Sequence, residues 1–219
     1  MVFIMKKIYA ILLILLFSVT SAVFAQADQR PQFQETTVKE IARDQIIESD
    51  FVAAEEVVEI SGTVLGDVYV AGGSVIISGK INGDVIAVGG NVDILGEVKQ
   101  NVRAIGGEIK LSGRVGRNVS VAGGTVYVKQ SAVLEGNALF AGGKVTIAAP
   151  IKGDVKIAGG DLRISNVIGG DVETLSDTLW LSSGARIQGN LTLMSAEDIV
   201  MDKNAFVEGE LVKKPFPKN

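Results

Sequence analysis

Residues 84–100 read DVIAVGGNVDILGEVKQ, and variants of this phrase return along most of the chain. Each copy opens with aspartate or asparagine, and successive openings are 17 or 19 residues apart. The openings lie at positions 50, 67, 84, 101, 118, 137, 154, 171 and 190. A nearly constant period of this length is typical of solenoids, in which every repeat forms one coil.

The apolar residues within a copy alternate with other residues, as in Val92, Ile94 and Val98. A period of two predicts short strands rather than helices. One coil cannot bury its inward face alone, so stacked coils about 4.8 Å apart must share a core of valine and isoleucine columns. The repeats therefore predict an all-β fold, a parallel β-helix of about nine coils of 17 residues over residues 50–212.

Glycine, with 26 residues in 219, is present at nearly twice its usual share of about 7%. Six copies carry a glycine pair, such as Gly89-Gly90. We expect each pair at a sharp corner, where it supplies a positive φ or room for close backbone approach. Single glycines at positions 62, 79, 96 and 113 are expected at the next corner, and the two extra residues of each 19-residue step at one corner as well.

Residues 1–25 have the features of a secretory signal peptide. Lys6 and Lys7 precede an apolar run at 8–19, and Ala25 ends a stretch of residues suited to cleavage. The sequence thus predicts an exported protein of the periplasm, the cell envelope or the extracellular space. An uncleaved segment, the alternative, would hold the chain at the membrane.

Two segments flank the predicted coils. Residues 26–49 are expected to form an N-terminal cap or linker, within which residues 36–47 are either a short amphipathic cap or an irregular first coil. Residues 213–219 form a C-terminal tail that contains Pro215, Pro217 and three lysines.

The composition excludes much chemistry. The chain has no cysteine and no histidine, which excludes serine–histidine triads, cysteine nucleophiles, zinc sites and thiol redox centres. Its formal net charge of −4 and its lack of basic runs argue against nucleic-acid binding. Carboxylate catalysis would need an acid pair about 5 to 9.5 Å apart, and no pattern marks one. We therefore predict no enzyme activity, no catalytic residue and no cofactor.

The Asp/Asn column, with Asp50, Asp67 and Asp84 in successive coils, is the most conspicuous candidate site. Stacked oxygens can bind calcium, but aspartate and asparagine also favour corners and hydrogen-bond local backbone. We adopt the corner interpretation and predict no metal site. The glycine pairs lack the helix or lysine of a phosphate-binding loop. Trp180 points outward, either as a surface contact or as partial packing.

Several phrases recur at matching places in the coils: Gly66-Asp-Val, Gly83-Asp-Val, Gly153-Asp-Val, SAVLEG at 131–136 and NAFVEG at 204–209. With these phrases, the stretch from about Asp50 to Leu211 resembles the bactofilin family of polymer-forming cytoskeletal proteins. The resemblance implies a small right-handed β-helix that joins end to end into filaments, without nucleotide or metal. Typical members are cytoplasmic and shorter, so this chain is similar to an exported relative.

The open ends of a solenoid need capping or pairing. We therefore predict an exported structural scaffold of the cell envelope that self-associates into a homo-oligomer or filament. Phe206, Leu211 and Phe216 are the predicted self-assembly contacts at the C-terminal end. The alternative is a binding module that contacts an envelope glycan or a protein partner along an outward face. A lyase or hydrolase would require a clustered acid pair on one face.

Overall fold

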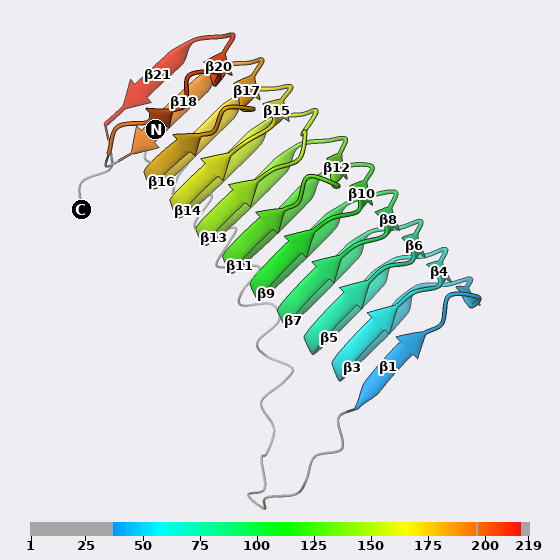
Figure 1. Ribbon diagram of the computed structural model, residues 1–219. Helices are drawn as coiled ribbons and strands as arrows, with labels where there is room; N and C mark the ends of the chain where they lie inside the picture. The colour runs from blue at the N-terminus through cyan, green and yellow to red at the C-terminus, as the bar shows by residue number, and fades with distance from the viewer. Residues whose placement is uncertain (1–36, 196, 216–219) are drawn as a thin grey trace, which may run out of the picture. The chain divides into compact units, whose positions relative to one another are not determined.

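The computed structural model describes residues 37–195 and 197–215. Over these residues the chain is an all-β solenoid of about 10 turns, stacked along one axis (Figure 1). Every paired strand is parallel to its neighbour, and Val68, Val85 and Val102 lie opposite one another in successive coils. The predicted parallel β-helix and its 17-residue period are confirmed, and its right-handedness stays a prediction. The predicted signal peptide lies outside the described residues.

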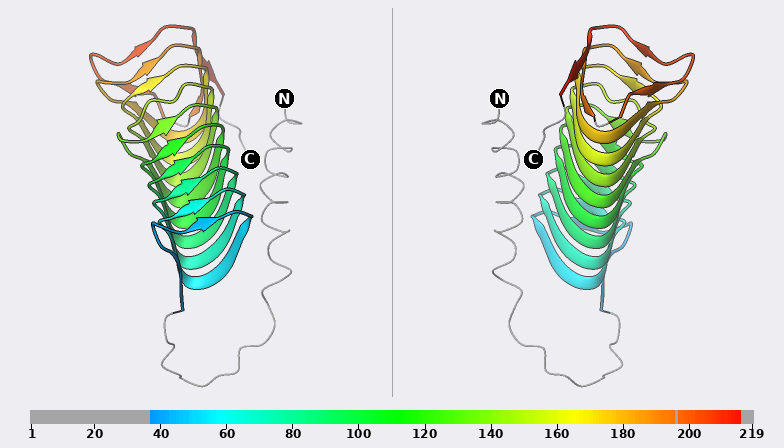
Figure 2. Two further views of the ribbon diagram at one scale, coloured as in Figure 1. Left: turned by 90° about the vertical axis from the view of Figure 1, so that its right-hand side faces the viewer. Right: turned by 90° about the vertical axis from the view of Figure 1, so that its left-hand side faces the viewer.

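Each complete coil contains one long, bent strand. The four residues before the glycine pair are here called the first arm (85–88 in β7), and the four after it the second arm (91–94). Figure 2 shows the resulting U-shaped bend of the long strands along the axis. The long strands are β3 (Phe51–Ile60), β5 (Val68–Ile77), β7 (Val85–Ile94), β9 (Val102–Leu111), β11 (Val119–Val128), β13 (Ala138–Ile147), β14 (Val155–Ile164) and β16 (Val172–Leu181).

A two-residue strand closes every coil except the one at Ile151 and makes the third face of the rod. These strands are β2 (Ile46–Ile47), β4 (Thr63–Val64), β6 (Lys80–Ile81), β8 (Glu97–Val98), β10 (Arg114–Val115), β12 (Val133–Leu134), β15 (Val167–Ile168), β17 (Arg186–Ile187) and β20 (Phe206–Val207). The strands at the ends of the long sheet are β1 (Val38–Ile41), β18 (Leu191–Ser195), β19 (Val200–Met201) and β21 (Leu211–Lys214).

The core is a set of inward columns. In one coil Val85, Ala87, Val92, Ile94 and Val98 are all buried, and the matching residues of the next coils lie directly above and below them. Outward residues of the same strands are mostly polar or half-exposed. Alternation along each strand combined with identity between coils produces one continuous apolar core.

Glycine serves close approach between coils. None of the described glycines has a left-handed φ, so the positive-φ explanation of the glycine pair is wrong. A Cβ on Gly96 would lie 1.9 Å from the carbonyl oxygen of Gly79, and a Cβ on Gly113 would lie 1.9 Å from that of Gly96. The corner beside the third face therefore requires glycine because backbone from the preceding coil occupies the side-chain space.

The four-residue corner of the longer coils also occurs in the first coil. In the 17-residue coils two residues, such as Ser78-Gly79, join the second arm to the third face, whereas four residues do so at 129–132 and 182–185. Residues 42–45 make the same turn, with the Gln45 N–H donating to the Ala42 carbonyl at 3.0 Å. The predicted insertion at one corner is confirmed, and the structure shows residues 38–47 as an incomplete first coil rather than an amphipathic cap.

The third face is interrupted at Pro150. A six-stranded and a three-stranded sheet meet there through bridges made by Ile151 alone. Proline has no N–H to donate to the ladder. In the following coil, the Asn166 amide donates to the Ala148 carbonyl and its side-chain oxygen accepts the Val167 N–H, both at 2.8 Å.

Candidate functional site

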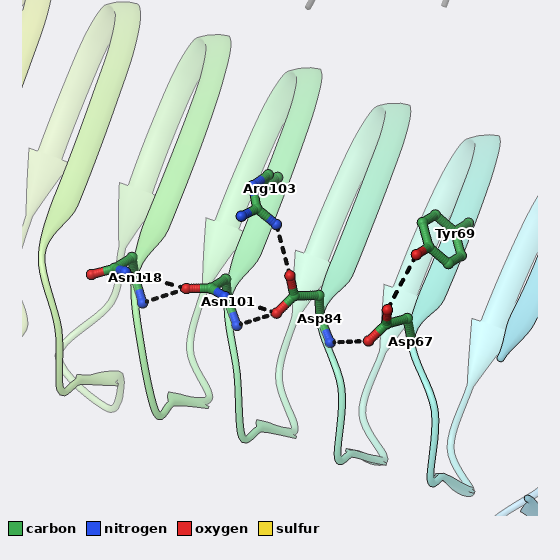
Figure 3. A network of polar contacts seen from close by, with 6 residues as sticks. All are labelled: Asp67, Tyr69, Asp84, Asn101, Arg103 and Asn118. Atoms are coloured by element: carbon green, nitrogen blue, oxygen red, sulfur yellow. Dashed lines mark hydrogen bonds and ion pairs between the residues drawn. The ribbon is translucent and has the colours of Figure 1, made fainter. Parts of the chain in front are cut away.

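The Asp/Asn column forms a hydrogen-bonded ladder along the rod. The Oδ1 atom of each member accepts the backbone N–H of the next member, at 2.7–3.2 Å, from Asp50 to Glu210 (Figure 3). The residue after each member donates its own N–H back to the carbonyl of the next member, as Val85 does to Asn101 at 2.9 Å. Two bonds thus clamp each opening residue to the coil before it.

This clamp explains the Asp/Asn preference of the column. A short side chain with an acceptor oxygen reaches the backbone of the next coil directly from this corner. The contacts support the structural interpretation, although the bonded backbone belongs to the neighbouring coil and not to the same corner. Within residues 37–195 and 197–215, no group of three or more acidic side chains is arranged to hold a metal ion.

Asp84 is the most strongly bonded acid of the column. Its Oδ2 pairs with the Arg103 guanidinium at 2.8 Å, while its Oδ1 accepts both N–H groups that Asn101 presents (Figure 3). Burial acts to raise the pKa of the Asp84 carboxyl, but the Asn101 and Arg103 donors outweigh burial and hold that pKa below its usual value. The neighbouring Tyr69 hydroxyl donates to Asp67 at 3.2 Å, which raises the pKa of Tyr69.

Acid should weaken the rod through Asp84. Because its pKa is lower in the folded protein, ionised Asp84 stabilises the fold above the usual carboxyl value of 3.8. This contribution declines as the pH falls below that value and is gone below the folded-state pKa. Urea denaturation from pH 6 to pH 2 should therefore show a smaller acid-induced loss for Asp84→Asn, which keeps the acceptor oxygen, than for wild type. Identical pH profiles for the two proteins would contradict this assignment.

Trp180 is packed against its neighbours. The guanidinium carbon of Arg163, in the preceding coil, lies 4.8 Å from the centre of the indole ring, and the ring nitrogen donates to Asp202 at 3.4 Å. The ring is nevertheless 41% exposed. Its face toward Arg163 is therefore occupied, which supports the interpretation as partial packing.

A shallow hollow lies on the third face beside the four-residue turn at 129–132. Leu95, Glu97, Arg114 and Ser131 contribute to its lining. Arg114 is already paired with Glu135 at 2.6 Å. With one lining carboxylate, the hollow does not supply the acid pair that a hydrolase requires.

The exposed apolar side chains concentrate at the two ends of the rod. Of the twelve large apolar side chains that are exposed in the described residues, eight lie on the terminal strands or their edges. At the N-terminal end they are Val38, Ile46 and Val52, and at the C-terminal end Val200, Met201, Phe206, Leu211 and Val212.

The predicted assembly residues divide between described and undescribed parts. Phe206, in β20, is 53% exposed, with the Arg186 guanidinium carbon 5.9 Å from its ring centre. Leu211 opens β21 and is 45% exposed. The structure places both residues at the C-terminal end, on different faces of the rod, and Phe216 lies outside the described residues.

The sequence left residues 36–47 open between a cap and an irregular first coil, and it predicted no assembly residue at the N-terminal end. Residues 41–49, IARDQIIES, match the register of VKQSAVLEG at 128–136, and this likeness could have revealed the first coil. Ile46, 64% exposed, occupies the column of the β4 and β6 residues Thr63 and Lys80. Val52, 74% exposed, lies on the first arm of β3. This arm pairs with β5 on one side, whereas β1 pairs with the second arm.

Comparison with models of known protein families, with curated proteins and with solved structures gave no match. No helix in the described part of the chain is long and apolar enough to cross a membrane.

Proposed function

We propose that this protein is an exported, bactofilin-like structural scaffold of the cell envelope, which assembles end to end through the open edges of its β-helix. The observation that supports this proposal is the concentration of exposed apolar side chains on the two terminal coils. Strand edges with unpaired N–H and carbonyl groups readily pair with another chain. Among the described residues, neither end has a helix or loop that covers these edges.

The long sides of the rod are less suited to self-association. Between the ends, the exposed side chains of Leu65 and Leu95 lie singly among polar and charged neighbours. Tyr69 lies opposite Val52, and Trp180 lies opposite Val200, so these two side chains adjoin the apolar residues of the ends. Ion pairs between adjacent coils, such as Lys80 with Glu97 and Lys156 with Glu173, cover further parts of these sides. Assembly through the ends therefore buries more apolar surface than lateral contact does.

Sedimentation velocity and electron microscopy of the purified protein test this proposal. We expect species that lengthen with concentration, and we expect Phe206→Asp to weaken association at least tenfold, because it places a charge in the contact. Leu95→Asp is the matched control, since Leu95 is similarly exposed but lies mid-rod. A strictly monomeric wild type over a wide concentration range would reject the scaffold role and leave the binding module on an outward face as the remaining candidate.

A further inference from the structure

The two ends of the rod are incomplete in opposite ways. At the C-terminal end, β21 adds a first arm above β18, whereas the second arm and third face stop one coil earlier, with β19 and β20. At the N-terminal end, β1 and β2 supply a second arm and a third face below β3 and β4, and within residues 37–195 no first arm accompanies them. Among the described residues, each end therefore carries the part of a coil that the other end lacks.

We infer that copies join head to tail so that β21 of one copy and β1 and β2 of the next form a single composite coil. This inference rests on the proposed self-assembly and specifies its partner, its polarity and its register. In the composite coil, β21 supplies the first arm, β1 the second arm and β2 the third face. The joint then continues the stacking of coils with no arm missing among the described residues.

The two ends of the described part of the chain, residues 37 and 215, fall at the same corner of the coil, so the described residues do not obstruct this joint. β21 is followed by Pro215, which stands in the column of Ser195 and Ser176, at the corner between the two arms. β1 begins with Val38 in the column of Val57 and Ser74, directly after that corner. The described chain thus leaves one copy and enters the next at the place where the two arms meet.

The shared register brings apolar residues of the two ends together. Column by column, Phe206 faces Ile46, Leu211 faces Phe51, Val212 faces Val52 and Met201 faces Ile41 of the next copy. The joint therefore places Leu211 and Met201, which are exposed in the isolated rod, in inward columns, whereas Ile46 and Phe206 stack beside each other on the outward side of the third face. Continuation of existing columns gives these contacts the spacing of the core.

The ladder of clamps also continues across the joint. In each coil the column residue and the residue after it bind the backbone of the next column residue. The last such pair in the chain is Asn190 and Leu191. The Asn190 Oδ1 accepts the Glu210 N–H at 2.9 Å, and the Leu191 N–H donates to the Glu210 carbonyl at 2.8 Å. Glu210 and Leu211 offer the next pair, a carboxylate acceptor and an N–H donor. Asp50, the first member of the column, presents its N–H and carbonyl in the matching positions of the following copy.

The charges of the two ends favour unlike ends over like ends. Lys214 falls in the column of Ala54, next to the Glu55-Glu56 corner of the following copy. Asp198, 91% exposed at its side chain, precedes Ile199, which in this register faces Lys39. A tail-to-tail joint would bring lysines 213 and 214 against their own copies, and a head-to-head joint would do the same with the two glutamates, whereas the head-to-tail joint places Lys214 beside the two glutamates.

Inward lysines make the joint selective. Lys39 and Lys213 occupy inward columns of the terminal strands, opposite Val58 and Leu193 respectively. Inward-pointing charges on an edge strand discourage pairing with an arbitrary strand. Lys213 is already paired with Asp198, and that carboxylate would also lie beside Lys39 of the next copy. An end without a carboxylate at this position would leave both lysines unpaired in the joint.

Cysteine cross-linking tests the polarity and register directly, because the chain has no cysteine of its own. Val52→Cys and Val212→Cys place thiols on the outward side of the joint, at residues that would be opposed across adjacent strands about 4.8 Å apart. A short bis-maleimide should link a mixture of the two single variants into dimers and should link the double variant into ladders. Each single variant alone should stay unlinked, because identical sites on joined copies are a full rod apart. Leu95→Cys controls for lateral contact.

The outcomes separate this inference from the proposed function. Dimers formed by Val52→Cys alone or by Val212→Cys alone would overturn the head-to-tail joint while end-to-end assembly stands. Assembly in sedimentation without any cross-link in the mixture would overturn the composite coil, because the register would then be different. Absence of assembly in the wild-type protein would reject the proposed function and the joint with it.

Discussion

Replacing Gly96 with alanine should lower the free energy of unfolding by more than about 3 kcal/mol, a loss seen only for severe backbone or core defects. The added Cβ would lie 1.9 Å from the Gly79 carbonyl oxygen, and that oxygen already accepts the Glu97 N–H at 3.1 Å. The colliding atom is backbone, so no rotamer change relieves the overlap. Urea denaturation followed by far-ultraviolet circular dichroism measures the loss.

Gly143→Ala is the matched control for this prediction. A Cβ on Gly143 has one neighbour within 4 Å, the Gly124 carbonyl oxygen at 3.1 Å. Since alanine restricts the unfolded chain more than glycine does, we expect a stability within about 1 kcal/mol of wild type. Equal losses in the two variants would show that close approach between coils is not the reason for the glycine column.

Phe140→Ala should cost about 3–5 kcal/mol, the range typical of a fully buried phenylalanine. Phe140 has no exposed surface and lies between Val121 of the preceding coil and Ile157 of the following one. Removal of the ring leaves a cavity in the middle of the rod, which the stacked coils on both sides cannot close by moving together without breaking their ladder. Urea denaturation measures this loss as well.

Phe206→Ala is the same substitution at an exposed end. At a protein concentration low enough to keep the rod monomeric, it should change stability by less than about 1 kcal/mol, because half of the ring already faces solvent. If Phe140→Ala proved no more costly than Phe206→Ala, the inward column around residue 140 would not be a close-packed core.

The coils could be predicted from the sequence because each contact between coils repeats itself. Every complete coil has an apolar residue in the columns of Val92, Ile94 and Val98. Residues that are one repeat apart in the sequence are also the residues that pair between adjacent strands. The first complete coil carries Glu55 and Glu56 in place of the glycine pair. Glycine is needed where a preceding coil presses its carbonyl oxygens into the corner, and within residues 37–195 no first arm lies beneath Glu55 and Glu56.

The ends could be predicted only in part. The position of Phe206 and Leu211 at the C-terminal end could be predicted, because both residues lie near the point where the period breaks. The complementary half-coils depend on which arm the first strand joins, and this is set by the pairing of Val38 with Val57 across 19 residues. Such pairing requires the turn at 42–45, whose sequence has neither glycine nor proline.

Because all coils share one register, the number of coils can change while the two terminal surfaces of the rod stay the same. Deletion of residues 84–100 would remove one coil and place Gly83 before Asn101, which opens the next copy of the same phrase. Every remaining contact would be of a type already present, and the rod would be shorter by about 4.8 Å. Gain or loss of whole coils thus makes the molecule a spacer of adjustable length whose terminal surfaces stay unchanged.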